Sequence, residues 1–470
     1  MLTFLILMPV VSAIAVSMPV RNIFRIRLLC AVSIIHAVIV VSFWRVLPPS
    51  EFCGYLALDY IGLILLSVIS LLFVPVSIFM MGYFKHEQRS GRRFVACLLL
   101  LLSTMTLVSV SYHMGLLWVA IETTTLFSAP LISFHKNRES LEATWKYLLV
   151  CSVGIALALI GTFFLAISAH DLRTLMLPEI LCGASKLSID WLKLSVIFLF
   201  VGYGCKIGFA PMHSWKPEAY GQATGMAAVI MAGGLTQCSF LALIRISQIC
   251  FKTGLEDFYA SILIVTGILS LIIPAVFILG EKNLKRSFAY SSVEHMGILI
   301  LGLGLGGIGI FGAFFHMINN ALAKVLMFLT AGSVAQKYGS SRMNDVRGVM
   351  HTYPVTGTFL IMALLGGTGI FPFATFHSEL MILNAAISSG HYIISLAAIV
   401  CLAVMFIGLS RIVLGFAHGQ PTEPVLAKKE NFFMNTAIAI SAIALIGLGL
   451  WMPVPIIRVI SEAVRLVEGK

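Results

Sequence analysis

Long apolar runs recur along the whole chain, and they limit the possible fold more than any other feature. One of them, FGAFFHMINNALAKVLMFLTAGSVA, covers residues 311–335. A helix of about 20 mostly apolar residues crosses the hydrocarbon core of a bilayer. Hydrophobic residues make up 59% of the 470 residues and charged residues 11%, whereas a soluble domain carries about 25% charged residues. The sequence therefore predicts a polytopic membrane protein.

The number of apolar runs predicts an all-α fold of about fourteen transmembrane helices. The first run, within residues 1–20, has no basic start, and arginines follow it, so we expect a retained helix and not a signal peptide. The last stretch, VISEAVRLVEGK, is expected to form either a short amphipathic interfacial helix or a solvated tail.

Lysines and arginines gather in the loops that follow odd-numbered spans. Arg92, Arg93, Lys136 and Lys216 are counted among these loop residues. The positive-inside rule then places these loops in the cytoplasm and both termini on the opposite side of the inner, cytoplasmic cell membrane. The formal net charge of +11 reflects topology and contact with anionic lipids, because no basic domain suited to nucleic acid is present.

Four ionisable residues fall deep inside apolar spans, namely Lys206, Lys324, Glu122 and Glu379, and Glu294 lies closer to a helix start. A charged side chain at the bilayer centre costs about 2.5–3.5 kcal/mol, so such residues face a protein interior or a hydrated cavity. Each alone could be a structural hydrogen bonder or ion-pair partner. Several in one chain favour an ion path.

Other ionisable residues are more ambiguous. Arg245 and Arg411 lie near span ends and are expected to reach the lipid headgroups. His213 and His295 lie near span boundaries and could be relay groups or ordinary interfacial hydrogen bonders.

One span carries polar residues at a helical spacing. His316, Asn320 and Lys324 follow one another at intervals of four residues, so they share one stripe of a helix. A neutral histidine can accept a hydrogen bond at one ring nitrogen and donate from the other, which suits His316 to a relay.

Two spans are interrupted by glycine and proline. The first reads FVGYGCKIGFAPMHSWKPEAYGQATG around Lys206, and the second reads ALLGGTGIFPFATFHSE before Glu379. Broken helices in corresponding positions, five spans apart, predict two inverted five-helix repeats. We expect helices 1–3 in residues 1–90, the first repeat (helices 4–8) in 91–250, the second (helices 9–13) in 251–418, and helix 14 with a tail in 419–470.

The nine cysteines are scattered singly, with no CxxC pair. This pattern indicates neither a zinc site nor an iron–sulfur site. We therefore expect no metal, no cofactor and no catalytic redox site in this chain, so that any redox chemistry lies in other subunits.

Five motifs carry a resemblance to a known family. They are WVAIE at Glu122, CKIGFAPMHSWKPEAYGQA, FAYSSVEHMG, FHMINNALAKVLMFLTAG and HSELMIL. Together they resemble the antiporter-like membrane subunits of respiratory complex I, of multisubunit cation/proton antiporters and of membrane-bound hydrogenases, over residues of about 90 to 415. The SSVEHMG form is most similar to the F-type subunit of hydrogenase-4 and formate hydrogenlyase.

The resemblance implies a proton relay in two halves. Glu122 would pair with Lys206 in the first half, and Lys324, with His316 beside it, would pass protons toward Glu379 in the second. Gln237 stands where the family usually has a lysine on the eighth helix. Asn320 stands where some members have a second histidine. Neither amide can change its protonation, although both can orient water, which puts the link between Lys206 and Lys324 in doubt.

Three functions fit these features. The favoured one is a proton-translocating subunit of a redox-driven hydrogenase or complex I-like assembly, bound to other membrane-arm subunits and to peripheral redox subunits. A cation/proton antiporter or inorganic-carbon uptake subunit would share the fold. The third is a membrane-arm subunit that does not pump. The residues leave open whether the ion is H⁺ or Na⁺.

Overall fold

A computed structural model describes residues 1–84, 91–419 and 429–469 of the chain. Eleven of the described helices are long and apolar enough to cross a membrane, and α1 and α16 are shorter apolar helices. The protein is therefore a multi-pass membrane protein, as predicted. Its helices are α1 (Leu2–Ser17), α2 (Asn22–Phe43), α3 (Tyr60–Tyr83), α4 (Arg92–Val110), α5 (Met114–Ile132), α6 (Arg138–Ser168), α7 (Leu177–Cys182), α8 (Ile189–Ile207), α9 (Trp215–Gln222), α10 (Gly225–Val229), α11 (Thr236–Thr253), α12 (Glu256–Ile278), α13 (Leu284–Leu305), α14 (Ile308–Tyr338), α15 (Val349–Thr352), α16 (Pro354–Gly367), α17 (Ala374–Ser388), α18 (Tyr392–His418), α19 (Phe432–Leu450) and α20 (Val454–Glu468).

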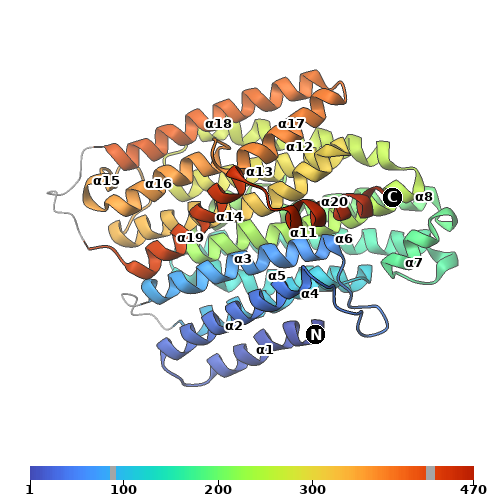
Figure 1. Cartoon of the computed structure of the whole chain (residues 1–470), viewed down its shortest axis with the longest axis horizontal. Helices are drawn as coiled ribbons and strands as arrows, with labels where there is room; N and C mark the ends of the chain where they lie inside the picture. Colours follow the sequence, from blue (N-terminus) through green and yellow to red (C-terminus); the bar gives the residue numbers. More distant parts are fainter. Residues whose placement is uncertain (85–90, 420–428, 470) are drawn as a thin grey trace.

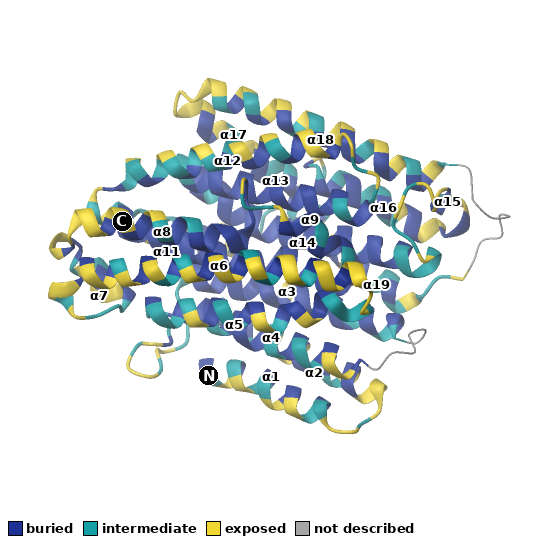
Figure 2. Cartoon of the chain, turned by 180° about the vertical axis from the view of Figure 1, so that it is seen from behind, coloured by how far each residue is buried: buried dark blue, intermediate teal, exposed yellow. Residues whose placement is uncertain are grey.

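The long helices lie side by side, with α1 and α2 at one edge of the bundle and α18 at the other (Figure 1). The long helix α14 packs against α3, α13, α16, α17 and α19. Buried residues concentrate on α13, α14 and α9, whereas α1, α12 and α18 carry many exposed ones (Figure 2). The core therefore surrounds α14, the helix that carries the polar stripe.

Small residues let two neighbouring helix pairs approach closely. A Cβ on Gly202 of α8 would lie 2.5 Å from the backbone nitrogen of Ala158 on α6. A Cβ on Gly297 of α13 would lie 2.9 Å from the carbonyl oxygen of Gly267 on α12. Such close backbone approach is the usual way in which membrane helices gain packing energy.

Two membrane helices are interrupted at the predicted places. The first ends with α8 and resumes as α9, and the second ends with α16 and resumes as α17. Gly208 directly follows α8 and Gly369 lies two residues beyond α16, with positive φ angles of 66° and 61°, a conformation that glycine adopts without strain. Pro211 and Pro372 each follow three residues later. The two breaks therefore share one local design.

Arg245 does not reach the lipid headgroups as expected. Its guanidinium is 1% exposed and forms a two-pronged ion pair with Asp59, at 2.6 Å (Nη1 to Oδ2) and 2.9 Å (Nη2 to Oδ1). Asp59 also caps α3 by accepting a hydrogen bond from the amide of Gly62. The sequence prediction failed because the partner carboxylate is distant in the chain. Arg411, by contrast, is exposed.

The carboxyl-terminal helix α20 packs against α11, α3 and α14. The Gln248 side chain donates to the carbonyl of Leu466 at 3.0 Å, and the Gly307 amide donates to the Glu468 carboxylate at 3.0 Å. The predicted amphipathic helix therefore lies on the bundle, hydrogen bonded to α11 and to the α13–α14 loop.

The loop residues Lys85, Arg89, Lys428 and Lys470 lie outside the described residues.

Candidate functional site

The first half of the predicted site lies where α5 meets the end of α8. Lys206 is completely buried two residues before Gly208. Its Nζ donates to the carbonyl oxygen of Ile121 at 2.5 Å and to the hydroxyl of Thr125. The Thr125 hydroxyl in turn donates to Glu122 Oε2 at 3.2 Å. Thr125 therefore links the two predicted partners, and the described residues show no direct ion pair between them.

The second half begins at Lys324 on α14. His316, Asn320 and Lys324 are all completely buried, so the predicted stripe faces the protein interior. The Lys324 Nζ donates to the hydroxyl of Ser291 on α13 at 3.1 Å. Lys324 is therefore anchored to a neutral hydroxyl and not to a carboxylate among the described residues.

Two histidines next to this lysine share a hydrogen bond. His295 Nδ1 and His316 Nε2 are 2.9 Å apart, His295 Nε2 lies 3.1 Å from the Gly367 carbonyl, and His316 Nδ1 lies 2.8 Å from the Ser378 hydroxyl. His295 is 1% exposed, so it is an interior group and not an interfacial one.

Hydrogen-bond polarity gives this pair two proton states. The Gly367 carbonyl can only accept, so His295 Nε2 carries a proton. With both rings neutral, His316 then donates to His295 and accepts from the Ser378 hydroxyl. When that hydroxyl turns to the Thr375 carbonyl, 3.0 Å away, His316 Nδ1 can keep its hydrogen bond only by donating, and the pair then holds one more proton. The rotation of one serine hydroxyl is therefore coupled to a proton.

Glu379 closes the second half beside the break before α17. Its Oε1 lies 4.0 Å from His295 Nδ1, and its carboxylate rests against Gly369. A cleft of 280 Å³ between α17 and α18 reaches the Glu379 side chain.

Glu294, expected near a helix start, instead lies in the middle of α13 and is 3% exposed. There it interacts electrostatically with Glu379 and Lys324. Both carboxylates therefore act on Lys324.

The two amides that replace ionisable family residues are buried without partners. Neither side-chain nitrogen nor oxygen of Gln237 or Asn320 has a hydrogen-bond partner among the described residues. Buried polar atoms are nearly always hydrogen bonded, to protein or to ordered water. A π-helical segment, η4 (Ile230–Leu235), ends two residues before Gln237, and such segments are frequent at functional sites. These amides therefore suit water binding.

Sequence reasoning missed Lys216. The sequence predicts a cytoplasmic loop residue here, but Lys216 is completely buried near the start of α9, and its Nζ has no hydrogen-bond partner within the described chain. His213 lies half-buried in the break itself. The burial of Lys216 could have been predicted from its position directly after the break. It lies there in a segment with Trp215 and Tyr220 that can form a short buried helix.

One group of side chains has ligand types suited to a metal. Ligand atoms of His295, His316 and Glu379 all lie within 4.8 Å of one another. The two facing ring nitrogens are 2.9 Å apart and share a hydrogen bond, which leaves no space for an ion between them. The charge of Lys324 also acts on both histidines. This arrangement favours proton exchange over cation binding.

The fold and the site together define an antiporter-like membrane subunit. The chain belongs to the NADH:quinone oxidoreductase/Mrp antiporter transmembrane family, whose model matches residues 111–406. A hydrogenase-4 component F homolog of Methylacidiphilum infernorum is 27% identical over 411 residues, 84% of this chain and 86% of the relative. NADH-quinone oxidoreductase subunit N of Deinococcus radiodurans is 25% identical over 406 residues, 86% of this chain and 82% of the relative.

A solved structure shows the same fold. A chain of the Mrp complex from Dietzia sp. DQ12-45-1b superposes with a TM-score of 0.90 at 18% identity, covering all of this chain and 97% of that one. The resemblance predicted from the sequence is thus confirmed at the level of family and fold.

Proposed function

We propose that this chain translocates protons across the cell membrane as a subunit of a redox-driven complex of the hydrogenase or complex I type. The supporting observation is the series of buried ionisable groups that begins at Glu122 and Lys206 and continues through Lys324 and the histidine pair to Glu379. Buried ionisable residues in a membrane protein mark ion paths. Lysine and histidine exchange protons but do not bind alkali cations, which favours H⁺ over Na⁺.

The path works by changes in side-chain partners. A lysine relays a proton when its ammonium is alternately stabilised and released. In this structure Lys206 bonds to Thr125 and a carbonyl, and Glu122 is one hydroxyl away. Movement of Glu122 toward Lys206 would hold the proton, and its withdrawal would send the proton onward toward Lys324.

Redox cofactors, other membrane-arm subunits and peripheral redox subunits complete the proposed complex. The names of the relatives, a hydrogenase component and a quinone oxidoreductase subunit, support this assignment. We also propose that both termini face the non-cytoplasmic side, because the described basic loops favour that orientation. Residues 91–250 and 251–418 form the two proposed repeats, supported by the shared Gly-x-x-Pro design of the two breaks, with residues 1–90 and 419–470 as flanking helices.

The test is proton uptake by inverted membrane vesicles that carry the whole native complex, with redox turnover measured in parallel. Lys206→Ala and Lys324→Ala should each abolish proton uptake at unchanged assembly. Lys193→Ala changes an exposed lysine on the same helix as Lys206 and should behave as wild type. Unchanged proton uptake in both relay variants would show that the chain is a structural subunit. Uptake that depends on Na⁺ would indicate the antiporter alternative.

A further inference from the structure

We propose that Lys216 carries protons between Lys206 and Lys324, in place of the ionisable residue that position 237 lacks. This inference rests on the proposed function and adds one residue to its path. Gln237 cannot gain or lose a proton under physiological conditions, so the two halves need another group between them.

Lys216 lies on a helix between the two halves of the proposed proton path. Helix α9 packs against α6 on one side and α13 on the other. The charges of Lys206 and Lys216 both act on Cys151 of α6, and the charge of Lys324 acts on Lys216. Lys216 therefore interacts electrostatically with Lys324 and shares Cys151 as a neighbour with Lys206.

Local packing fixes the lysine stem. A Cβ on Gly208 would lie 2.9 Å from both Cδ and Cε of Lys216, so the stem runs along the end of α8, two residues beyond Lys206. The indole of Trp215 donates to the Cys205 carbonyl at 2.9 Å and packs on Tyr147 with ring centroids 5.0 Å apart. Helix α9 is thereby held to α8 and α6, which keeps Lys216 in place.

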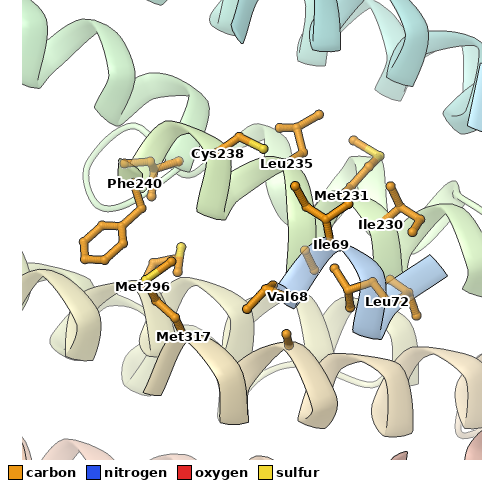
Figure 3. Close-up of a cluster of buried hydrophobic side chains, with 14 of the residues drawn as sticks. Val68, Ile69, Leu72, Ile230, Met231, Leu235, Cys238, Phe240, Met296 and Met317 are labelled. Atoms are coloured by element: carbon orange, nitrogen blue, oxygen red, sulfur yellow. The ribbon is translucent and has the colours of Figure 1, made fainter. Parts of the chain in front are cut away.

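The part of η4–α11 around Gln237 offers no titratable nitrogen and lies beside an apolar cluster. Leu235, Cys238 and Phe240 belong to a cluster of buried apolar side chains that also includes Val68 and Leu72 of α3, Met296 of α13 and Met317 of α14 (Figure 3). Every one of these side chains is fully or almost fully buried. This cluster offers no titratable nitrogen to a proton, and the amide of Gln237 beside it cannot titrate, whereas Lys216 on α9 can.

The surroundings of Lys216 suit a group that changes charge. The carboxyl end of α8 presents partial negative charge to an ammonium, whereas the amino end of α9 and the charge of Lys324 oppose it. The Nζ has no hydrogen-bond partner among the described residues. No hydrogen bond therefore favours the ammonium over the neutral amine, or the reverse. A permanently charged structural lysine would instead be expected to have a carboxylate partner.

The transfer is a simple exchange of N–H bonds. The ammonium of Lys206 loses a proton, directly or through water, and the amine of Lys216 gains it, which leaves Lys206 neutral. Lys216 then gives the proton to the neutral amine of Lys324. No electrons move, and the total charge of the three lysines is unchanged by either step.

The experiment compares Lys216→Met with wild type in vesicles that carry the whole complex, at equal assembly and redox turnover. Methionine keeps the apolar stem and removes the charge, and loss of a buried unpaired charge does not weaken folding. We expect proton uptake to fall at least about tenfold. Lys285→Met is the matched control, because Lys285 is also a buried lysine but its Nζ donates to the Ala223 carbonyl at 3.0 Å; it should retain wild-type uptake for each assembled complex.

The double variant Lys216→Met with Gln237→Lys provides a second measurement. Recovery of uptake would support the inference, because a titratable nitrogen would again stand between the halves. Wild-type uptake in Lys216→Met, or failure of the double variant to recover, would overturn it. If Lys324→Ala still abolishes uptake in those cases, the proposed function stands without Lys216. If Lys206→Ala and Lys324→Ala also leave proton uptake unchanged, the proposed function itself fails.

Discussion

The carboxylate of Glu379 rests against the Cα of Gly369 so closely that no side chain fits between them. Gly369 also has a φ of 61°, which allows the chain to leave α16 and turn back toward α17. Glycine is therefore needed at this position for two reasons, the backbone turn and the room for the Glu379 carboxylate.

Gly369→Ala should displace the Glu379 carboxylate and strongly reduce proton uptake in vesicles that carry assembled complex. The added methyl group would collide with the carboxyl oxygens, which are held near His295. Gly390→Ala separates this collision from backbone strain, because Gly390 also has a positive φ, 76°, but a Cβ there meets nothing within 4 Å. Equal effects of both changes would mean that strain alone explains the loss.

Thr125→Val should slow proton uptake by roughly tenfold, because it removes the hydroxyl that connects Lys206 to Glu122 and keeps the shape of the side chain. The measurement is the initial rate of uptake for each assembled complex. Thr123→Val is the control, since the Thr123 hydroxyl bonds only to the backbone carbonyl of Val119 among the described residues. A normal rate in Thr125→Val would indicate that Glu122 and Lys206 exchange protons without this bridge.

Ser378→Ala should also slow uptake by about tenfold, because His316 Nδ1 loses the hydroxyl that alternates between accepting and donating. Ser395→Ala changes another buried serine, whose hydroxyl bonds to the His391 carbonyl, and should have no effect on uptake. If Ser378→Ala retains the wild-type rate, the two proton states of the histidine pair are not used in transport.

Asp59→Asn should destabilise the subunit by about 3–5 kcal/mol, because it leaves the buried Arg245 guanidinium without its countercharge. Asparagine can still cap α3, so the charge is the main property removed. The thermal unfolding of the detergent-solubilised complex measures the change. Combining Asp59→Asn with Arg245→Leu should recover most of the lost stability, because the cap is kept and no charge is left unpaired. A double variant as unstable as Asp59→Asn would show that the unpaired guanidinium is not the cause.

Sequence reasoning located the groups that lie in regular helices. Lys324, His316 and Asn320 could be placed on one buried stripe because helical spacing alone decides which residues share a face. The interruptions beside Lys206 and Glu379 could be located because glycine and proline mark them directly.

It failed where tertiary contacts decide. Lys216 reads as a loop residue because its neighbours Pro217 and Glu218 are polar or helix-breaking, and hydropathy does not reveal that a short helix folds back into the bundle. Arg245 was misplaced because its partner Asp59 is distant in the sequence. Glu294 was placed near a helix start, whereas α13 begins ten residues earlier, at Leu284.

Helix α20 contacts both proposed repeats and connects them. It packs on α11 of the first and α14 of the second, and its carboxyl end is hydrogen bonded to Gln248 and Gly307. Many transporters alternate access by rocking one repeat against the other, and a helix that is packed on both repeats opposes such rocking. For the proposed proton transport, this contact favours gating by small movements of side chains and water over rocking of the two repeats.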